Sequence, residues 1–205
     1  QLDLSGVVKV SAGYENAMIL LDDNSIRTMG KNDKGECGTG NTTQQRTPYN
    51  PTLPAEAVGN ISDIQATRHS NYIILNNGDV YYSGEGSSTV NTFTKDTGLT
   101  NIVSASAWHT GNQIVFTDSS NNTFFRGSNY DSMWTTNASY NTNVEKAYIA
   151  SHCIFYVKTD GTVMATGRRN QMGVNSSSTS YLATTITDLQ DLSINQIIGS
   201  EGGNT

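Results

Sequence analysis

Short apolar runs separated by polar turns recur along the chain, and this pattern is typical of β-strands. Runs such as Met18–Leu21 and Tyr72–Leu75 are apolar at successive positions. Because the runs are short, often β-branched and bounded by Asn, Asp and Gly, they favour strands over helices. A strand that is apolar on both sides needs cover on both faces, so the pattern predicts sheets stacked between neighbouring sheets.

These runs belong to a repeated unit. The upstream segments 7–21, 61–75, 102–116 and 144–158 align with one another, and turns such as Asn77-Gly78 and Asp160-Gly161 favour two-residue hairpins. Each unit then reaches a shared glycine, and the glycines are spaced by 54, 43 and 40 residues, a period typical of propeller blades. The shared glycines are Gly30, Gly84, Gly127 and Gly167.

One such unit cannot bury its own apolar faces, whereas a ring of them can. The predicted fold class is therefore all-β: a single β-propeller region spanning residues 1–205, which forms part of a larger ring or an open arc completed by more sequence or another subunit. The repeats are predicted at approximately 6–56, 57–100, 101–143 and 144–192, with a partial fifth unit at 193–205. In the third unit the register around Trp108 and His109 is ambiguous by two residues.

The units resemble a known family. The pattern of a small residue, Gly, two variable residues, a polar residue, an apolar strand, a turn and then G-x-N-x-x-G resembles the regulator of chromosome condensation repeat, most closely in residues 10–40 and 157–173. The resemblance implies a β-propeller, usually of seven blades. The repeats are degenerate, which supports the fold more than any inherited activity. The family's usual Trp before the glycine is here Met29, Ser83, Arg126 and Thr166, and its usual His is Asn16, Ser70 and Cys153.

Composition narrows the range of partners. The formal net charge is −6, and the 12 Lys and Arg residues are scattered, so nucleic acid is disfavoured. No apolar run is long enough for a membrane helix, so membrane insertion is not expected. Abundant Asn, Ser, Thr and Gly are common in extracellular and virion proteins, which favours such a location, with the cytoplasm as the alternative. The two cysteines, Cys37 and Cys153, exclude a disulfide framework and read as small core residues.

No catalytic motif is visible, and we expect neither catalytic residues nor a cofactor. The glycine-rich stretches lack the GK[ST] ending and the following helix of a phosphate loop. The three histidines lie in different units without metal-ligand spacing, so no metal site is predicted. Propeller hydrolases gather acids from several blades, but Glu15, Glu85 and Glu201 read as solvated surface residues.

The variable loop residues that recur once per unit are the candidate binding residues. If the loops share one face, they form a loop crown of aromatic, Arg and His side chains, types enriched at binding hot spots. The predicted function is a non-catalytic interaction or structural domain, such as a tail-fibre or receptor-contacting module, that binds a protein or other subunits of an assembly. The loop crown comprises Tyr14, Glu15, Arg68, His69, Trp108, His109, Ser151 and His152.

Two alternatives remain open. The first is a regulatory subunit resembling the nucleotide-exchange or ubiquitin-ligase propellers of the family. The second is a glycan-binding propeller, for which Trp134 with Tyr130 and Tyr140 offers aromatic side chains in a polar loop, although partial burial is the favoured reading of these residues.

Overall fold

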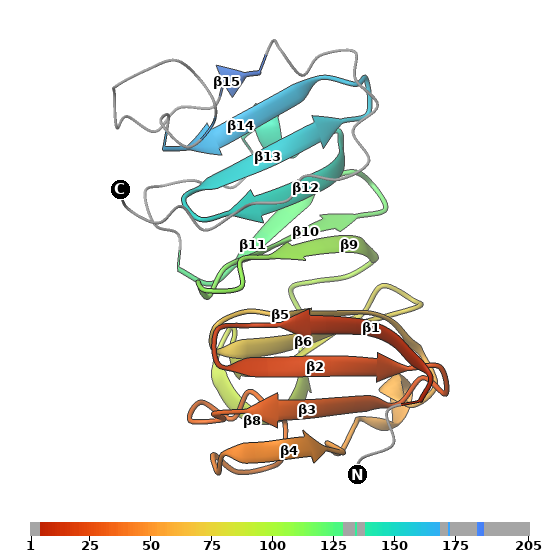
Figure 1. Cartoon of the computed structure of the whole chain (residues 1–205). Coiled ribbons are helices and arrows are strands. Elements are labelled where there is room, and N and C mark those ends of the chain that lie inside the picture. Colours follow the sequence, from red (N-terminus) through yellow and green to blue (C-terminus); the bar gives the residue numbers. More distant parts are fainter. Residues whose placement is uncertain (1–4, 129–133, 135–137, 169–171, 173–183, 187–205) are drawn as a thin grey trace. The chain divides into compact units, whose positions relative to one another are not determined.

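A computed structural model describes residues 5–128, 134, 138–168, 172 and 184–186 (Figure 1). Within these residues the strands form separate antiparallel sheets, as the apolar pattern predicts. The first sheet contains β1 (Val7–Ala12), β2 (Asn16–Leu21), β3 (Ile26–Gly30) and β4 (Gln45–Tyr49). The second contains β5 (Ile61–Ala66), β6 (Ser70–Leu75), β7 (Val80–Glu85) and β8 (Thr89–Lys95).

The other sheets follow the same order along the chain. The third contains β9 (Ile102–Ala107), β10 (Ile114–Asp118) and β11 (Thr123–Arg126). The fourth contains β12 (Val144–Ala150), β13 (Cys153–Lys158), β14 (Val163–Gly167) and β15 (Thr184–Thr185). Helix in the described part is limited to 3₁₀ turns such as η1 (Ala55–Ala57) and η3 (Ser139–Asn141), and none of it is long enough to cross a membrane.

The chain divides into two compact units. Unit 1 comprises Gln1–Ile102 and Trp108–Asn112, and unit 2 comprises Val103–Ala107 and Gln113–Thr205. The first two sheets thus belong to unit 1, and the fourth sheet belongs to unit 2. The predicted repeat boundaries stay predictions, and the partial repeat at 193–205 lies outside the described residues.

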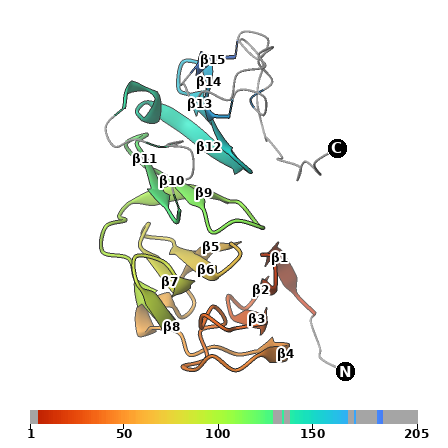
Figure 2. The same cartoon turned by 90° about the vertical axis from the view of Figure 1, so that its left-hand side faces the viewer.

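In unit 1 the first two sheets lie side by side and share one apolar core (Figure 2). The first sheet contributes Met18, Leu20 and Ile26, and the second contributes Ile61, Ile64, Ile73 and Leu75, which are between 0% and 5% exposed. At about 25 cal/mol per Å² of apolar surface, mutual burial of two such faces is the main force that holds the sheets together. The predicted covering of one sheet by the next is therefore present in unit 1.

A hairpin turn also ties each sheet to the next strand along the chain. In the β2–β3 turn Asn24 adopts a positive φ of 62°, and its side chain pairs with the backbone of Ile61: the Ile61 amide donates to Asn24 Oδ1 at 2.7 Å, and Asn24 Nδ2 donates to the Ile61 carbonyl at 2.8 Å. At the same position of the β6–β7 turn, the backbone carbonyl of Gly78 accepts from the Ile102 amide at 3.0 Å. In unit 2 the Val144 amide donates to Asn121 at 2.8 Å.

The shared glycines Gly30, Gly84 and Gly167 each lie on the third strand of their sheet, where they allow the strand to approach the loop between the first and second strands. At Gly84, where φ is +94°, a Cβ would lie 2.1 Å from the carbonyl oxygen of His69. The next amide, that of Glu85, donates to the same oxygen at 2.9 Å. Gly30 and Gly167 repeat this arrangement with the carbonyls of Glu15 and His152, at 2.2 and 2.1 Å. A side chain is sterically excluded at these points, which explains why the glycine recurs.

The structure resolves the register of the third unit. Ile114 pairs with Arg126 in the third sheet, so the residue before it, Gln113, is next to the shared Gly127. Gln113 is therefore the equivalent of Ser70, which pairs with the shared Gly84 in the second sheet. Residues 108–112 therefore separate the strands here, two more than residues 67–69 in the second unit. Trp108 and His109 lie in this longer loop.

Both cysteines are core residues, as the sequence predicts. Cys37 and Cys153 are free thiols, 0% and 2% exposed, and burial is the main cause that raises the pKa of each thiol from 9.0 to about 12. Because the thiolate is the reactive form, a thiol with so high a pKa is inert at neutral pH.

We therefore expect Ellman's reagent at pH 8 to label neither cysteine of the folded chain and both after unfolding in urea. The free energy of unfolding should also fall as the pH rises above about 9, because the unfolded thiols then ionise while the folded ones stay protonated. Labelling of the folded chain as fast as that of the unfolded chain would contradict the burial.

Candidate functional site

The candidate site of unit 1 is built on the β1–β2 and β5–β6 turns, which lie at the same end of the two sheets. Tyr14 is 56% exposed, and the guanidinium carbon of Arg68 lies 5.0 Å from the centre of the Tyr14 ring. Asn16, at the position of the family's usual His, holds the second turn in place: its Nδ2 donates to the carbonyls of Thr67 and Arg68, each at 3.0 Å. The cation–π pair is thus presented to solvent by a fixed backbone.

A cluster of polar side chains centred on Glu85 adjoins this pair. His69 Nδ1 lies 3.1 Å from Glu85 Oε2, Asn112 Nδ2 donates to the same oxygen at 3.2 Å, and Lys34 Nζ lies 3.5 Å from Glu85 Oε1. We refer to Lys34, His69, Glu85 and Asn112 as the Glu85 cluster. The Glu85 side chain is 33% exposed, so the cluster is reachable from solvent while its carboxylate is held from several sides.

The loop that carries Trp108 and His109 packs onto the β5–β6 turn. The Arg68 amide donates to the carbonyl of Gly111 at 2.8 Å, and Thr67 Oγ1 donates to Asn112 Oδ1 at 2.9 Å. His109 is exposed, with Nδ1 3.3 Å from the carbonyl oxygen of Ala66. The half-buried Trp108 begins this segment.

The first six predicted crown residues therefore lie in unit 1, whereas Ser151 and His152 lie in unit 2. Both of these are half-buried in the β12–β13 turn, where Ser151 has a φ of +43° and the His152 carbonyl accepts from the Arg168 amide at 2.9 Å. That all eight residues contribute to one binding face stays a prediction.

Charges of both signs surround the Tyr14–Arg68 pair. Lys31 Nζ lies 2.9 Å from Glu15 Oε2 and 3.3 Å from Asp33 Oδ2. The hydrogen bonds that the Lys31 ammonium donates to Glu15 and then to Asp33 raise the pKa of Lys31. Glu15, a predicted crown residue, is thus engaged by a neighbouring cation, and Arg68 is the crown cation that stacks on an aromatic ring.

Sequence reasoning missed Glu85 and Lys31 as site residues, although the signal was present. Each directly follows a shared glycine, and the tight approach of that glycine to the loop carbonyl places the next side chain beside the loop. Glu85 thereby meets His69, and Lys31 meets Glu15. The residue after the shared glycine is a second position that recurs once per unit.

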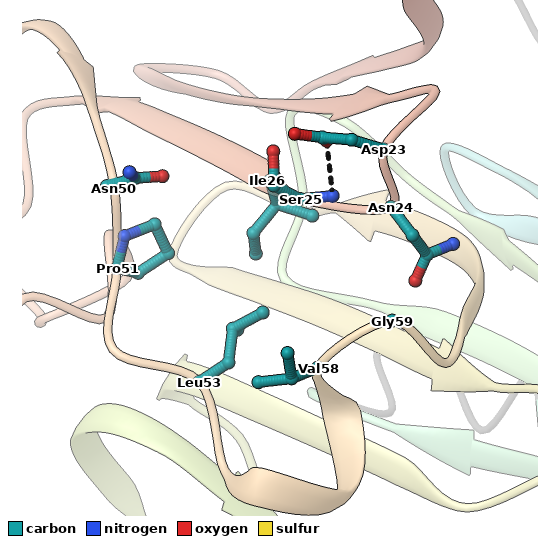
Figure 3. Close-up of a pocket in the computed structure, with 9 residues that line it drawn as sticks. All are labelled: Asp23, Asn24, Ser25, Ile26, Asn50, Pro51, Leu53, Val58 and Gly59. Atoms are coloured by element: carbon teal, nitrogen blue, oxygen red, sulfur yellow. Dashed lines mark hydrogen bonds between the residues drawn. The ribbon is translucent and has the colours of Figure 1, made fainter.

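A shallow pocket lies at the opposite end of the first sheet, beside the β2–β3 turn (Figure 3). Its volume is roughly 360 Å³, and apolar side chains of Ile26, Leu53 and Val58 project into it. Asp23 lies at its edge, but this carboxylate accepts from the Ser25 amide at 2.9 Å, and the hydrogen bonding to Ser25 lowers its pKa. The other polar side chains that line the pocket are engaged elsewhere: Asn24 with the Ile61 backbone, and Ser25 and Asn50 with Arg27. The loops therefore carry the better candidate.

The glycine-rich loop after β3 is structural. Asn32 Oδ1 accepts from the Cys37 amide at 2.8 Å, while Glu36 accepts from the amides of Asn32 and Lys34, each at 2.9 Å. The Glu36 carbonyl in turn accepts from Asn71 Nδ2 at 2.8 Å in the second sheet. These bonds use the polar groups that a phosphate would need, and the loop serves to join the first two sheets.

Among the residues that the structure describes, no group of three or more His, Cys, Asp or Glu side chains is placed to hold a metal ion. Trp134 is half-buried, and its ring stacks on Phe125 with the ring centres 6.2 Å apart. The favoured partial burial of this aromatic loop is thus present at Trp134. Tyr140 packs on Tyr156, with the ring centres 5.5 Å apart. Tyr130 lies outside the described residues.

Antiparallel sheets that follow one another along the chain, the first two of them stacked by their apolar faces, are the features of a β-propeller fold. The comparisons agree: residues 7–36 match the regulator of chromosome condensation (RCC1) repeat. The fold of the chain is thus that of a β-propeller, and residues 7–36 match an RCC1 repeat. No curated protein shows significant sequence similarity to it.

Solved structures share the fold at low identity. Kap60-bound yeast RCC1 (Prp20) matches with a TM-score of 0.75 and 18% identity over 95% of this chain and 51% of that chain. Prp20p from Saccharomyces cerevisiae matches with a TM-score of 0.75 and 18% identity over 94% of this chain and 53% of that chain. Human WBSCR16 matches with a TM-score of 0.67 and 16% identity over 86% and 51%. The chain thus spans about half the length of the propellers that it matches.

Proposed function

We propose that the chain is a non-catalytic interaction domain that binds a protein partner through the loops of unit 1. The observation that carries this proposal is the exposed Arg68–Tyr14 pair beside the Glu85 cluster. Arg and Tyr are among the residues that contribute most at protein interfaces, because each combines apolar contact area with directed polar groups.

The backbone beneath the pair is ordered before any partner arrives. Asn16 and Gly111 bind the backbone on both sides of Arg68, and Asn112 binds Thr67. A surface that is already ordered loses less conformational entropy on binding, so more of the contact energy appears as affinity. Fixed loops on a rigid scaffold are well suited to recognition.

The charges define the kind of partner that fits. Arg68 offers a cation on the Tyr14 ring, and Lys34 offers a second one beside the Glu85 carboxylate, whereas Lys31 is engaged by Glu15 and Asp33. A folded protein surface that presents carboxylates around a single cationic or hydrogen-bond donor group would complement this arrangement. The structures of Prp20 concern its binding to Kap60, to Gsp1p and to histones, which supports protein binding as a use of this fold.

We further propose that the domain works at an extracellular or virion surface, as a receptor-contacting or structural module. The low proportion of charged residues, 15%, and the abundance of Asn, Ser, Thr and Gly support this location. Immunoblotting of secreted fractions and purified virions from the source against cytoplasmic extract tests it, and recovery in the cytoplasm alone would refute it.

Photo-crosslinking tests the interaction. A benzoylphenylalanine at position 14 should trap a discrete partner from source extract, whereas the same group at Tyr49, which is 40% exposed on β4, should not. With the partner purified, Arg68→Ala should raise the Kd at least roughly tenfold, the effect of losing a hot-spot residue. The melting temperature should stay unchanged because Arg68 is exposed.

Two outcomes would count against the site. Equal trapping from positions 14 and 49 would show that the contact is nonspecific. A fall in melting temperature that accounts for the loss of binding in Arg68→Ala would make Arg68 a structural residue instead.

A regulatory propeller subunit is the second candidate, favoured by the structural likeness to Prp20. Release of bound nucleotide from Gsp1p, measured by fluorescence with and without the chain, tests the exchange activity that this candidate implies. An unchanged release rate would remove the exchange reading. Binding on a glycan array that is lost in Trp108→Ala would instead favour the glycan alternative.

A further inference from the structure

A second pocket of unit 1 lies between the loop that follows β3 and the edge strand β8. Its volume is about 340 Å³, and four of its six lining residues are exposed. Both walls belong to unit 1, and the cation–π pair of the loop site is not part of the lining. Hydroxyl and amide side chains predominate in this pocket. The lining residues are Lys34, Thr42, Thr89, Val90, Asn91 and Thr92.

The loop wall is held by a buried side chain. Asn32 is 0% exposed, and its Nδ2 donates to the carbonyls of Asn41 at 3.1 Å and Thr43 at 2.8 Å. Thr42 lies between these two anchored residues, so its backbone is fixed. Asn41 Oδ1 also accepts from the Thr43 amide at 2.8 Å, which closes the turn around Thr42. This wall of the pocket is therefore ordered without a ligand.

The loop is also joined to β8. The Gly40 amide donates to the Asn91 carbonyl at 2.7 Å, and Asn91 Nδ2 donates to the Gly40 carbonyl at 3.0 Å. At Gly35 a Cβ would lie 2.6 Å from the Cα of Asn91, so the loop rests directly on the strand. The middle of the β8 edge is thus occupied by the chain itself, which disfavours the addition of a peptide strand there. A preformed pocket of this kind loses little conformational entropy on binding.

An irregularity in β8 shapes the other wall. Tyr82 pairs with Thr94 and Gly84 pairs with Val90, so two steps along β7 match four steps along β8. A regular strand directs successive side chains to opposite faces, whereas a bulge re-aims them. The extra residues of β8 allow four consecutive residues, 89–92, to line one pocket.

The pocket offers hydroxyl groups that the chain itself does not use. In the described part of the structure the hydroxyls of Thr42, Thr89 and Thr92 bond to no protein group. Each hydroxyl can donate one hydrogen bond and accept two, so the three together favour a ligand whose groups also do both. Sugar hydroxyls have this property, whereas an ionised carboxylate only accepts.

The charged side chain in the lining is balanced. Lys34 Nζ lies 3.5 Å from Glu85 Oε1, so an anion in the pocket would meet a carboxylate as well as an ammonium. A neutral ligand therefore fits better than an ion. The half-buried Val90 adds an apolar contact, which the C–H face of a sugar ring can cover.

We propose that this pocket binds one neutral sugar unit of a glycan. The threonine hydroxyls and the Lys34 ammonium bond to sugar hydroxyls, and Val90 packs on the ring. Each of these bonds replaces a bond to water, so the net gain per bond is small and a single site should have a Kd of roughly 1 mM. The proposal is independent of the protein partner proposed for the loops, because Tyr14 and Arg68 do not line this pocket.

A glycan array of neutral and sialylated oligosaccharides tests the proposal, with the biotinylated chain on streptavidin so that several weak sites act together. The wild type should bind neutral glycans that share one terminal sugar. Saturation-transfer NMR with that free sugar should then give a Kd that Thr92→Val raises about three- to tenfold, because one hydroxyl is removed. Thr89→Val should have an effect of the same size.

Thr94→Val is the matched control. Thr94 lies on β8 and is exposed, but it does not line the pocket, and its hydroxyl donates to the Thr92 carbonyl at 3.2 Å. This variant should bind the sugar like the wild type. Arg68→Ala should also bind it unchanged, which separates this pocket from the loop site. If Thr92→Val lowers the melting temperature, Thr89→Val decides in its place.

Four results would overturn the proposal. A wild type that binds no neutral glycan would remove the sugar as ligand. A preference for sialylated glycans would show that the pocket takes an anion. Equal effects of Thr92→Val and Thr94→Val would show that the pocket hydroxyl does not make the contact. Binding that is lost in Trp108→Ala and kept in Thr92→Val would place the sugar at the Trp108 loop instead.

Discussion

Replacing Gly84 with alanine is expected to lower the free energy of unfolding of unit 1 by about 3–5 kcal/mol, from overpacking and backbone strain together. The new Cβ would lie 2.1 Å from the His69 carbonyl oxygen and 3.0 Å from the Cα of Ser70, and both are backbone atoms that cannot rotate away. The φ of +94° adds strain for any residue with a side chain. Urea denaturation followed by circular dichroism measures the loss.

Gly59→Ala is the matched control for this experiment. Gly59 also has a positive φ, +71°, but nothing lies within 4 Å of its Cβ position. Its substitution should therefore cost only the backbone term, about 1–2 kcal/mol. Equal losses at Gly84 and Gly59 would show that the close approach to His69 contributes nothing, and would contradict the explanation offered for the recurring glycine.

Lys158→Met is expected to destabilise unit 2 by about 2–4 kcal/mol, because the charge-assisted hydrogen bonds from one buried lysine to three carbonyls are lost. Lys158 is 9% exposed, and its ammonium donates to the carbonyls of Ser139 at 3.2 Å, Tyr140 at 3.1 Å and Thr142. These bonds fasten the segment before β12 to the end of β13. Methionine keeps the length and apolar stem of lysine but has no donor.

Lys95→Met serves as the control. Lys95 pairs with Asp79 at 2.7 Å, but its side chain is 41% exposed, and an exposed ion pair contributes little to stability. Its melting temperature should match the wild type in differential scanning calorimetry. A Lys158→Met variant as stable as Lys95→Met would show that the three carbonyls find water instead, and that the ammonium does not hold the segment.

Much of the fold follows from patterns that are local in the sequence. The apolar run Met18–Leu21 predicts a strand covered on both faces, and each of its residues is at most 7% exposed. The Asn77-Gly78 turn joins β6 to β7, with Gly78 at a φ of +80°. These features depend on the alternation of side chains and on backbone sterics, which act over a few residues and can be read in order along the chain.

The candidate site was only partly predictable. The recurrence of loop positions once per unit selects Tyr14, Arg68 and His69 as candidates, and the structure brings two of them, Tyr14 and Arg68, into a cation–π contact. Glu85 and Asn112 were not selected, because their roles depend on residues 16 and 27 positions away in the sequence. A carboxylate next to a glycine looks like any solvated surface residue until its neighbours are placed.

The sequence by itself determined the strands, the hairpin turns and the glycines that a crowded backbone requires, because each of these is imposed by local sterics and by the need to bury apolar side chains. Only the tertiary structure decided that Glu85 is the centre of a polar cluster, that the Trp108 loop packs on the β5–β6 turn, and that the loop after β3 and strand β8 together line a polar pocket. These last facts depend on which sheet lies against which, and the packing of one blade against another is not encoded within the span of any single repeat.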